Sequence, residues 1–222
     1  MSKILYFGTD PKNFSCYAEV IHCPLVKIVP RDPREQPVLS AYKKLPKATH
    51  ILFTSKNSVR IFFDHIKQLE ISLESIKKRS LLAVGSSTAA ALLSQGIANM
   101  HVAADECQEG LIAKLCSLDL DRAHLFLPHS SLARPNLVEF FIKRGLEYTA
   151  FDLYDTVAVQ PKPLPNLEEF EEIVFTSPSV VHAFMRFFPT LPEKIRIRVQ
   201  GAITEKALKS YLTAKKQEIF YV

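Results

Sequence analysis

Short hydrophobic runs that pass into a polar turn and then into a helical pattern recur along the chain. Four segments have this form: HILFTSKNSVRIFF at 50–63, LLAVGSSTAAAL at 81–92, EIVFTSPSVVHAFM at 172–185 and IRVQGAITEKAL at 197–208. Each begins with a β-branched or aromatic run and continues with apolar residues near a period of 3.6, which predicts a strand followed by a helix. Because a parallel pair of strands needs a long crossover, which a helix normally supplies, this alternation predicts an α/β fold with parallel sheets covered on both faces.

The chain is internally duplicated. The FTS motifs at 53–55 and 175–177 match at an offset of 122, and the GSST and GAIT motifs match at an offset of 116. An opening segment precedes the motifs in each half, at 3–29 and at 124–154, and each reads as strand, polar loop, helix and strand. The same order of elements in both halves indicates a repeat.

Proline-rich stretches follow both opening segments, with prolines at 30, 33 and 37 and at 161, 163 and 165. Proline restricts its own φ and the residue before it, so both stretches are expected to be extended linkers. Each linker separates an opening segment from the FTS and GxxT motifs. An opening segment can therefore dock on its own half or on the other one, and periodicity does not decide between them.

Composition favours a soluble cytosolic protein. The apolar run of four residues before Gly8 is too short for a secretory signal, and no stretch approaches the roughly 20 apolar residues that cross a bilayer. The net charge of +5 admits a nucleic acid as partner, but the basic residues do not cluster. The cysteines lack metal-ligand spacing and are expected to be reduced thiols: Cys16, Cys23, Cys107 and Cys116.

Hydroxyl side chains follow the predicted strands of both motif pairs. Ser55 and Ser177 stand where a helix N-cap is expected, and Thr88 and Thr204 follow glycine turns, where they cap or line the first helical turn. The free N–H groups of helix starts suit a carboxylate or phosphate, and ligands of open α/β sheets collect at the carboxyl ends of the strands. Capping alone and binding of a ligand with several anionic groups both stay open.

Three more residues stand at predicted strand ends. His129 and Arg134 lie in the LPHSSLAR loop, where Arg134 suits a bidentate pair with a carboxylate, and Tyr154 closes the strand FDLYDT. A purely structural role stays open for each. The sequence has no GxxxxGK[ST] loop, no GxSxG elbow and no HExxH pair, which excludes several common nucleotide, hydrolase and zinc sites.

Taken in order, the motifs resemble the uroporphyrinogen-III synthase family: CPLVKIVP, ILFTSKNSV, AVGSSTAAAL followed by Gly96, LARPNL, the 145–154 strand running into LYDT, IVFTSPSVV and GAIT. The resemblance spans nearly the whole chain. It implies two similar parallel-sheet, flavodoxin-like domains joined by a two-stranded linker. Residues 1–30 and 164–222 would form domain 1, 38–155 domain 2, and 31–37 and 156–163 the linkers.

The resemblance also implies a cyclising hydro-lyase of haem biosynthesis. Its substrate is hydroxymethylbilane, a linear tetrapyrrole with eight carboxylates, which closes to uroporphyrinogen III with loss of water and inversion of ring D. The expected enzyme is a cytoplasmic monomer that uses no cofactor or metal and associates with neither nucleic acid nor membrane. Tyr154 matches the tyrosine expected to donate a proton to the departing hydroxyl. The expected substrate-binding residues are Ser55, Ser87, Thr88, Arg134, Ser177 and Thr204.

Three places depart from the family pattern. Gly8, Thr9 and Asp10 follow the opening strand where many relatives carry Arg-Pro, Lys56 stands where proline is common, and His129 stands where arginine is common. Contacts to substrate carboxylates are therefore expected to be redistributed. A non-catalytic two-domain binder of an anionic metabolite is the alternative, since paired α/β domains with extended linkers also form hinged receptors.

Overall fold

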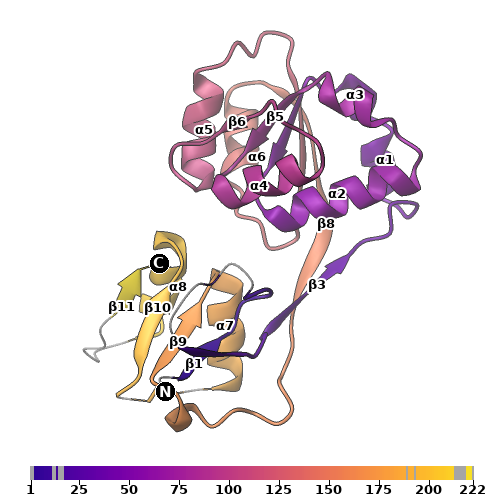
Figure 1. Cartoon of the computed structure of the whole chain (residues 1–222). Coiled ribbons are helices and arrows are strands. Elements are labelled where there is room, and N and C mark those ends of the chain that lie inside the picture. Colours follow the sequence, from indigo (N-terminus) through magenta and orange to yellow (C-terminus); the bar gives the residue numbers. More distant parts are fainter. Residues whose placement is uncertain are drawn as a thin grey trace. The chain divides into compact units, whose positions relative to one another are not determined.

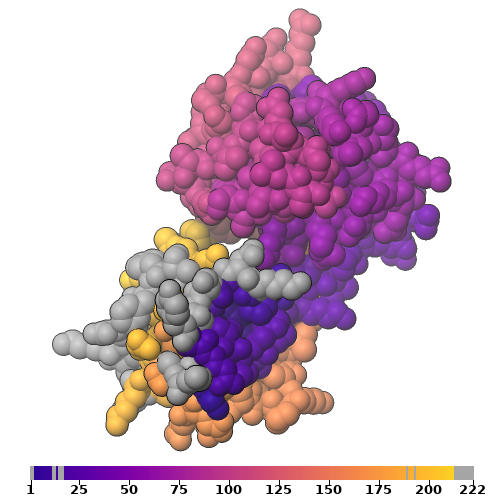
Figure 2. Space-filling view, viewed as in Figure 1, coloured from indigo at the N-terminus to yellow at the C-terminus, as the bar shows by residue number. Residues whose placement is uncertain are grey.

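The computed structural model describes residues 3–11, 14, 18–188, 190–192, 194–212 and 219–221 of the 222-residue chain. The chain divides into two compact units, one formed by Met1–Lys27 with Thr156–Val222 and the other by Ile28–Asp155. Unit 1 is built from separate stretches of sequence. Its indigo N-terminal strand lies in one sheet with orange and yellow strands from the far end of the chain (Figure 1), and atoms of these colours lie together in the space-filling view (Figure 2).

Unit 1 contains a five-stranded parallel sheet in the order β11-β10-β9-β1-β2. Its strands are β1 (Lys3–Tyr6), β2 (Glu19–His22), β9 (Glu172–Phe175), β10 (Arg196–Val199) and β11 (Ile219–Tyr221). The 3₁₀ turn η2 (Leu167–Glu169) precedes β9, and helices α7 (Pro178–Phe187) and α8 (Ala202–Lys209) follow β9 and β10. Phe7, Phe175 and Phe184 are fully buried at the centre of its core.

Unit 2 contains a six-stranded sheet in the order β3-β8-β7-β4-β5-β6. Its strands are β3 (Val26–Pro30), β4 (His50–Phe53), β5 (Ser80–Ala83), β6 (His101–Val102), β7 (His124–Ser130) and β8 (Glu147–Ala158). Its helical elements are α1 (Val38–Tyr42), η1 (Leu45–Lys47), α2 (Lys56–Gln68), α3 (Leu73–Lys77), α4 (Ser86–Ser94), α5 (Gln108–Cys116) and α6 (Asn136–Lys143). The pairs from β8 through β7, β4 and β5 to β6 are parallel, as the sequence predicts.

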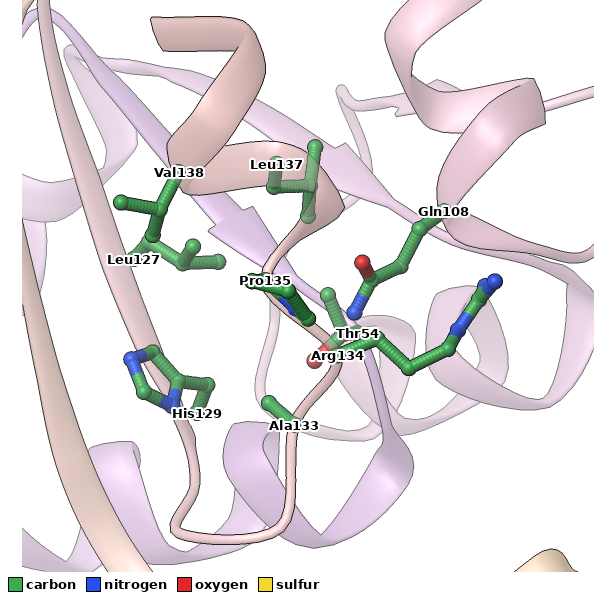
Figure 3. Close-up of a pocket in the computed structure, with 9 residues that line it drawn as sticks. All are labelled: Thr54, Gln108, Leu127, His129, Ala133, Arg134, Pro135, Leu137 and Val138. Carbon is green, nitrogen blue, oxygen red and sulfur yellow. The ribbon is translucent and has the colours of Figure 1, made fainter. Parts of the chain in front are cut away.

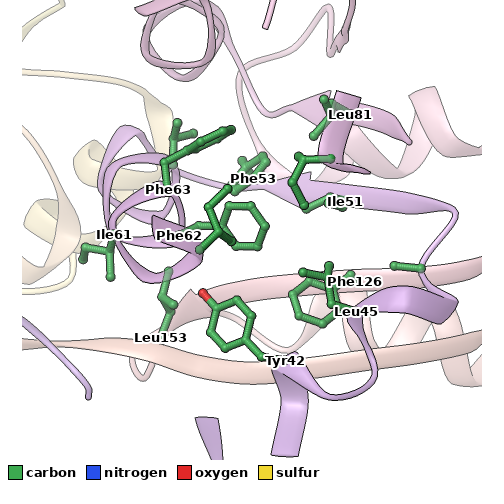
Figure 4. Close-up of a cluster of buried hydrophobic side chains, with 14 of the residues drawn as sticks. Tyr42, Leu45, Ile51, Phe53, Ile61, Phe62, Phe63, Leu81, Phe126 and Leu153 are labelled. Carbon is green, nitrogen blue, oxygen red and sulfur yellow. The ribbon is translucent and has the colours of Figure 1, made fainter. Parts of the chain in front are cut away.

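Alternate residues of the unit 2 strands face two separate cores. In β4, Ile51 and Phe53 join a cluster with α1, α2 and α4, whereas Leu52 joins a cluster with α5 and α6. Figure 4 shows the first cluster, in which Phe62 and Phe126 pack against Tyr42, and Phe53 packs against Phe62. Successive strand residues point to opposite faces, so helices cover both faces of the sheet.

The two sheets share one strand order. With β7, β8, β4, β5 and β6 in the places of β1, β2, β9, β10 and β11, the order in unit 2 repeats that in unit 1. The repeat seen in the sequence is thus a repeat of topology. The pairing also answers how the opening segments dock, because β1 pairs with β9 and β7 with β4. Each opening segment therefore joins the FTS strand of the other half.

The stretch 31–37 forms turns, so the expectation that it is extended is wrong. The Asp32 carboxylate accepts a hydrogen bond from the Arg34 N–H at 2.8 Å, and the Asp32 carbonyl accepts one from the Glu35 N–H at 3.2 Å. An aspartate that binds the backbone two residues on favours a turn over an extended strand. The edge strand β3 pairs with β8, and the Arg31 N–H continues this contact by donating to the Leu153 carbonyl at 3.0 Å.

Within the described ranges, none of the helices has both the length and the apolar character needed to span a membrane.

Candidate functional site

Ser55 and Tyr154 meet at the carboxyl edge of the unit 2 sheet. Ser55 follows β4 with extended backbone and caps α2, where its Oγ accepts a hydrogen bond from the Ser58 N–H at 3.0 Å. Tyr154 lies in β8 with only 5% of its surface exposed, and its hydroxyl is 2.9 Å from Ser55 Oγ. A helix cap and a strand residue 99 positions away in sequence thus share one hydrogen bond.

The environment of Tyr154 keeps its hydroxyl protonated. Burial raises the pKa of the Tyr154 phenol above its usual value of 10.0, and hydrogen bonds with Ser55 and Ser130 offset part of that rise. Burial has this effect because the phenolate loses its hydration. At neutral pH the Tyr154 side chain is therefore a proton donor held in place by two serines.

His129 and Arg134 line a cavity of about 240 Å³ next to this cluster of hydroxyls. His129 Nδ1 is 2.8 Å from the Ser130 carbonyl oxygen. A carbonyl only accepts, so Nδ1 is the donor in this contact. Asp152 is 3.5 Å from His129 Nδ1 and also 3.3 Å from Arg31, which makes a bidentate pair with Asp155 at 2.9 and 3.0 Å.

Arg134 pairs with a carboxylate of this chain. Its two terminal nitrogens donate to the two oxygens of Glu109 at 2.5 and 2.9 Å, and Asn136 Nδ2 donates to the same carboxylate at 3.0 Å. The hydrogen bond from Arg134 is the main cause that lowers the pKa of Glu109 from 4.5 to about 2. A ligand carboxylate that uses Arg134 must therefore displace Glu109.

A second internal carboxylate occupies the start of α4. Glu106 accepts a hydrogen bond from the Ser86 N–H at 2.8 Å, and hydrogen bonds from the side chain and backbone of Ser86 lower the pKa of Glu106. A Cβ on Gly85 would lie 2.6 Å from the Glu106 carboxyl carbon, so glycine makes room for this contact. In the same turn Ser87 is exposed and Thr88 is buried.

Ser177 and Thr204 occupy the corresponding turns of unit 1. Ser177 caps α7 by accepting from the Val180 N–H at 3.4 Å, and its Oγ lies 2.9 Å from that of Ser179. The buried Thr204 hydroxyl donates to the Gln200 carbonyl at 2.7 Å and so locks the turn before α8. Gly8 belongs to the turn that differs from the Arg-Pro of many relatives. A Cβ on Gly8 would lie 2.7 Å from the Thr176 side chain, so a larger residue fits at this position only if a neighbouring side chain moves.

Comparison with known proteins identifies the family. The family model described as uroporphyrinogen-III synthase HemD matches residues 17–217. The chain belongs to the uroporphyrinogen-III synthase family. The sequence-based assignment to this family is thereby confirmed.

Other members of the synthase family agree in sequence and fold. The porphyrin biosynthesis protein HemD of Ruminiclostridium josui is 23% identical over 200 residues, which cover 87% of this chain and 40% of that protein. The chain thus spans less than half the length of this curated relative. A mutant uroporphyrinogen III synthase from Thermus thermophilus superposes with a TM-score of 0.68 at 19% identity, covering 100% of this chain and 92% of that one. The uroporphyrinogen-III synthetase of Helicobacter pylori gives 0.65 at 16% identity, with the same coverage. These structural matches bear out the mixed α/β fold with parallel sheets.

The residues expected from the resemblance to the synthase family fall into several groups. The N-caps predicted for Ser55 and Ser177 are confirmed. Ser55 also contacts Tyr154 through their hydroxyls. Arg134 lines the cavity of about 240 Å³, and Ser87 and Thr88 lie in the first turn of α4. The substrate-binding roles of these residues, and those of Ser177 and Thr204, stay predictions.

Sequence reasoning missed the internal partners Glu106 and Glu109. Their only signal was the three acidic residues of the polar run 104–110, immediately before or at the start of a helix. Among the described residues, no group of three or more His, Cys, Asp or Glu side chains is arranged to hold a metal ion. Cys23, Cys107 and Cys116 are free thiols, and Cys16 lies outside the described residues.

Proposed function

We propose that this chain is a uroporphyrinogen-III synthase that converts hydroxymethylbilane to uroporphyrinogen III in haem biosynthesis. The observation that carries the proposal is the match of the family model over residues 17–217. The buried, protonated Tyr154 hydroxyl supports it, because the reaction begins with the departure of a hydroxyl group and needs a proton donor.

In the proposed mechanism Tyr154 donates a proton as the C–O bond of the hydroxymethyl group breaks and water leaves. The electron-deficient azafulvene that remains is attacked by the substituted carbon of ring D, which gives a spiro intermediate. The bond between this carbon of ring D and its original bridging carbon then breaks, and the freed bridging carbon bonds to the unsubstituted carbon of ring D, which inverts the ring. That carbon loses its hydrogen as a proton, which restores the Tyr154 hydroxyl. Most of the work is geometric, since the new bond joins the two ends of one substrate.

The carboxylates of the substrate need several weak sites instead of one strong one. We assign them to Ser55, Ser87, Thr88, Arg134, Ser177 and Thr204. Ser55, the Ser87–Thr88 turn and Arg134 follow strands β4, β5 and β7, and ligands of open parallel sheets bind at such strand ends. Two internal contacts support this assignment. The Ser86 N–H already binds the Glu106 carboxylate and Arg134 binds the Glu109 carboxylate, so both groups can bind an anion.

We further propose that both units are flavodoxin-like domains joined by a two-stranded linker. The order β2-β1-β9-β10-β11 corresponds to the flavodoxin order 2-1-3-4-5, and unit 2 repeats it. The proposed domains are 1–30 with 164–222, and 38–155, with 31–37 and 156–163 as linkers. We expect the enzyme to act as a cytoplasmic monomer without cofactor, nucleic acid or membrane.

The deciding experiment incubates the purified chain with freshly made hydroxymethylbilane and separates the products by isomer. Without an enzyme the bilane closes to isomer I, so heat-inactivated protein is the control. We expect isomer III from the native protein only. Isomer I alone, formed in the presence of protein with an intact circular dichroism spectrum, would overturn the proposal.

A further inference from the structure

Gln108 has a buried side-chain oxygen without a partner. It is the first residue of α5, and 9% of its surface is exposed. No described group donates a hydrogen bond to its Oε1. Buried acceptors are nearly always paired in native proteins, and an exception calls for an explanation such as an absent ligand.

Gln108 lines the cavity that His129 and Arg134 also line. Figure 3 shows the Gln108 carboxamide beside Thr54, with its nitrogen nearest Thr54 and its oxygen turned away from that residue. The rest of the lining is mostly apolar: Leu127, Ala133, Leu137 and Val138, with the stem of Arg134. The open acceptor therefore belongs to a residue of a mostly apolar cavity.

The size and chemistry of the cavity select its ligand. Its volume of about 240 Å³ is below the roughly 300–1,000 Å³ of sites for drug-sized molecules, so it suits one small ring and not a whole tetrapyrrole. An apolar wall with one open acceptor fits a flat ring that carries an N–H donor. Pyrrole has both properties.

We propose that this cavity is a subsite for one pyrrole ring of the substrate, whose N–H donates to Gln108 Oε1. The inference rests on the proposed function, because hydroxymethylbilane supplies the pyrrole. Gln108 is then a residue that positions the substrate, and Leu127, Pro135 and Val138 contact the ring face. Loss of the acceptor should weaken binding and leave the chemical step nearly intact.

The first test is Gln108→Leu, which keeps the size of the side chain and removes its polar end. We expect KM for hydroxymethylbilane to rise about 2- to 10-fold, the effect of one hydrogen bond, with kcat unchanged. Gln95→Leu is the control at another glutamine, since Gln95 is the C-cap of α4 and does not line the cavity. An unchanged KM in Gln108→Leu, with isomer III still formed by the native protein, overturns the subsite and leaves the proposed function standing.

The second test uses the native protein and does not depend on folding of a variant. The probe is porphobilinogen, a single pyrrole with acetate and propionate groups, and its N-methylated analogue is the control without a donor. We expect porphobilinogen to shift the side-chain amide resonance of Gln108 in ¹H–¹⁵N spectra, and the N-methyl analogue to bind at least several-fold more weakly. Equal binding of both probes, or no shift at Gln108, overturns the proposal.

Discussion

Replacing Tyr154 by phenylalanine tests whether the Tyr154 hydroxyl has a catalytic role or only a structural one. The substitution removes a single oxygen from a side chain that is 5% exposed and leaves the ring in its core. Two hydrogen bonds are lost, with Ser55 and with Ser130, while Ser55 keeps its bond to the Ser58 N–H. The structure therefore predicts a small loss of stability.

The two expected magnitudes differ widely. A neutral hydrogen bond contributes about 1 kcal/mol net, so Tyr154→Phe should lower the free energy of unfolding by about 1–2 kcal/mol. A general acid contributes about 10²- to 10⁴-fold in rate, which corresponds to about 3–5 kcal/mol in the activation free energy. If Tyr154 donates the proton, kcat for isomer III falls far more than stability does.

Tyr42→Phe is the matched control, because Tyr42 belongs to the same core cluster and its hydroxyl has no hydrogen-bond partner among the described residues. Figure 4 shows that hydroxyl among hydrocarbon side chains. Removing it should leave kcat unchanged and raise the free energy of unfolding by about 1 kcal/mol, since an unpaired buried group is lost. Single-turnover rates and urea unfolding measure the two effects. A fall in kcat of less than about tenfold for Tyr154→Phe would refute the assignment of the general acid.

Other predictions concern the serine caps, the internal ion pair and pH. Ser55→Ala should destabilise α2 by about 2 kcal/mol, because it removes one cap and the buried hydrogen bond with Tyr154. Ser177→Ala should destabilise α7 by about 1 kcal/mol, because its cap bond is longer, at 3.4 Å, and its second partner, Ser179, is partly exposed and can bond to water instead. Equal losses of protection in amide hydrogen exchange would contradict the contact of Ser55 with Tyr154. Glu109→Gln should free Arg134 and lower KM for the bilane at constant kcat, and an unchanged KM would show that Arg134 does not bind the substrate. The stabilisation that Glu109 gives is full above pH 4.5 and is lost as pH falls toward about 2, so the unfolding free energies of native protein and Glu109→Gln should converge over that window. Because the pKa of Tyr154 is raised above 10.0, the rate should show no alkaline fall from this group below about pH 10, and a titration near 8 in kcat that disappears in Tyr154→Phe would contradict the burial argument.

Local chemistry explains which features the sequence predicted. Ser55 and Ser177 were recognisable as caps because a cap depends on a few neighbouring residues. The repeat predicted two equivalent sets of strands because each strand-turn-helix motif is also defined by neighbouring residues. The turn at 31–37 was missed because one side chain, Asp32, outweighs the extended preference of the prolines around it.

The contacts across the sheet edge were beyond local reasoning. The bond between Ser55 and Tyr154 depends on how β8 lies along β7 and how β7 lies along β4, and a shift of one residue would turn Tyr154 to the other face. The pairing of Glu106 with Ser86 and of Glu109 with Arg134 depends on the neighbouring loops that the strand order brings together. The two glutamates are visible in the sequence, but only the fold supplies their partners.

The pairing of β1 with β9 sets the order in which the chain can fold during synthesis. Ile4 pairs with Glu172, so β1 waits for its central neighbour until the whole of unit 2, which lies between the two strands in sequence, has been made. Unit 2 is continuous in sequence and can fold during that interval. Once unit 2 has folded, the Arg31 N–H and the Leu153 carbonyl are held 3.0 Å apart. The chain that must be closed to join β1 to β9 is then shorter than the full sequence between them, which lowers the entropic cost of the pairing. We therefore expect damage to the core of unit 2 to delay the assembly of unit 1 as well.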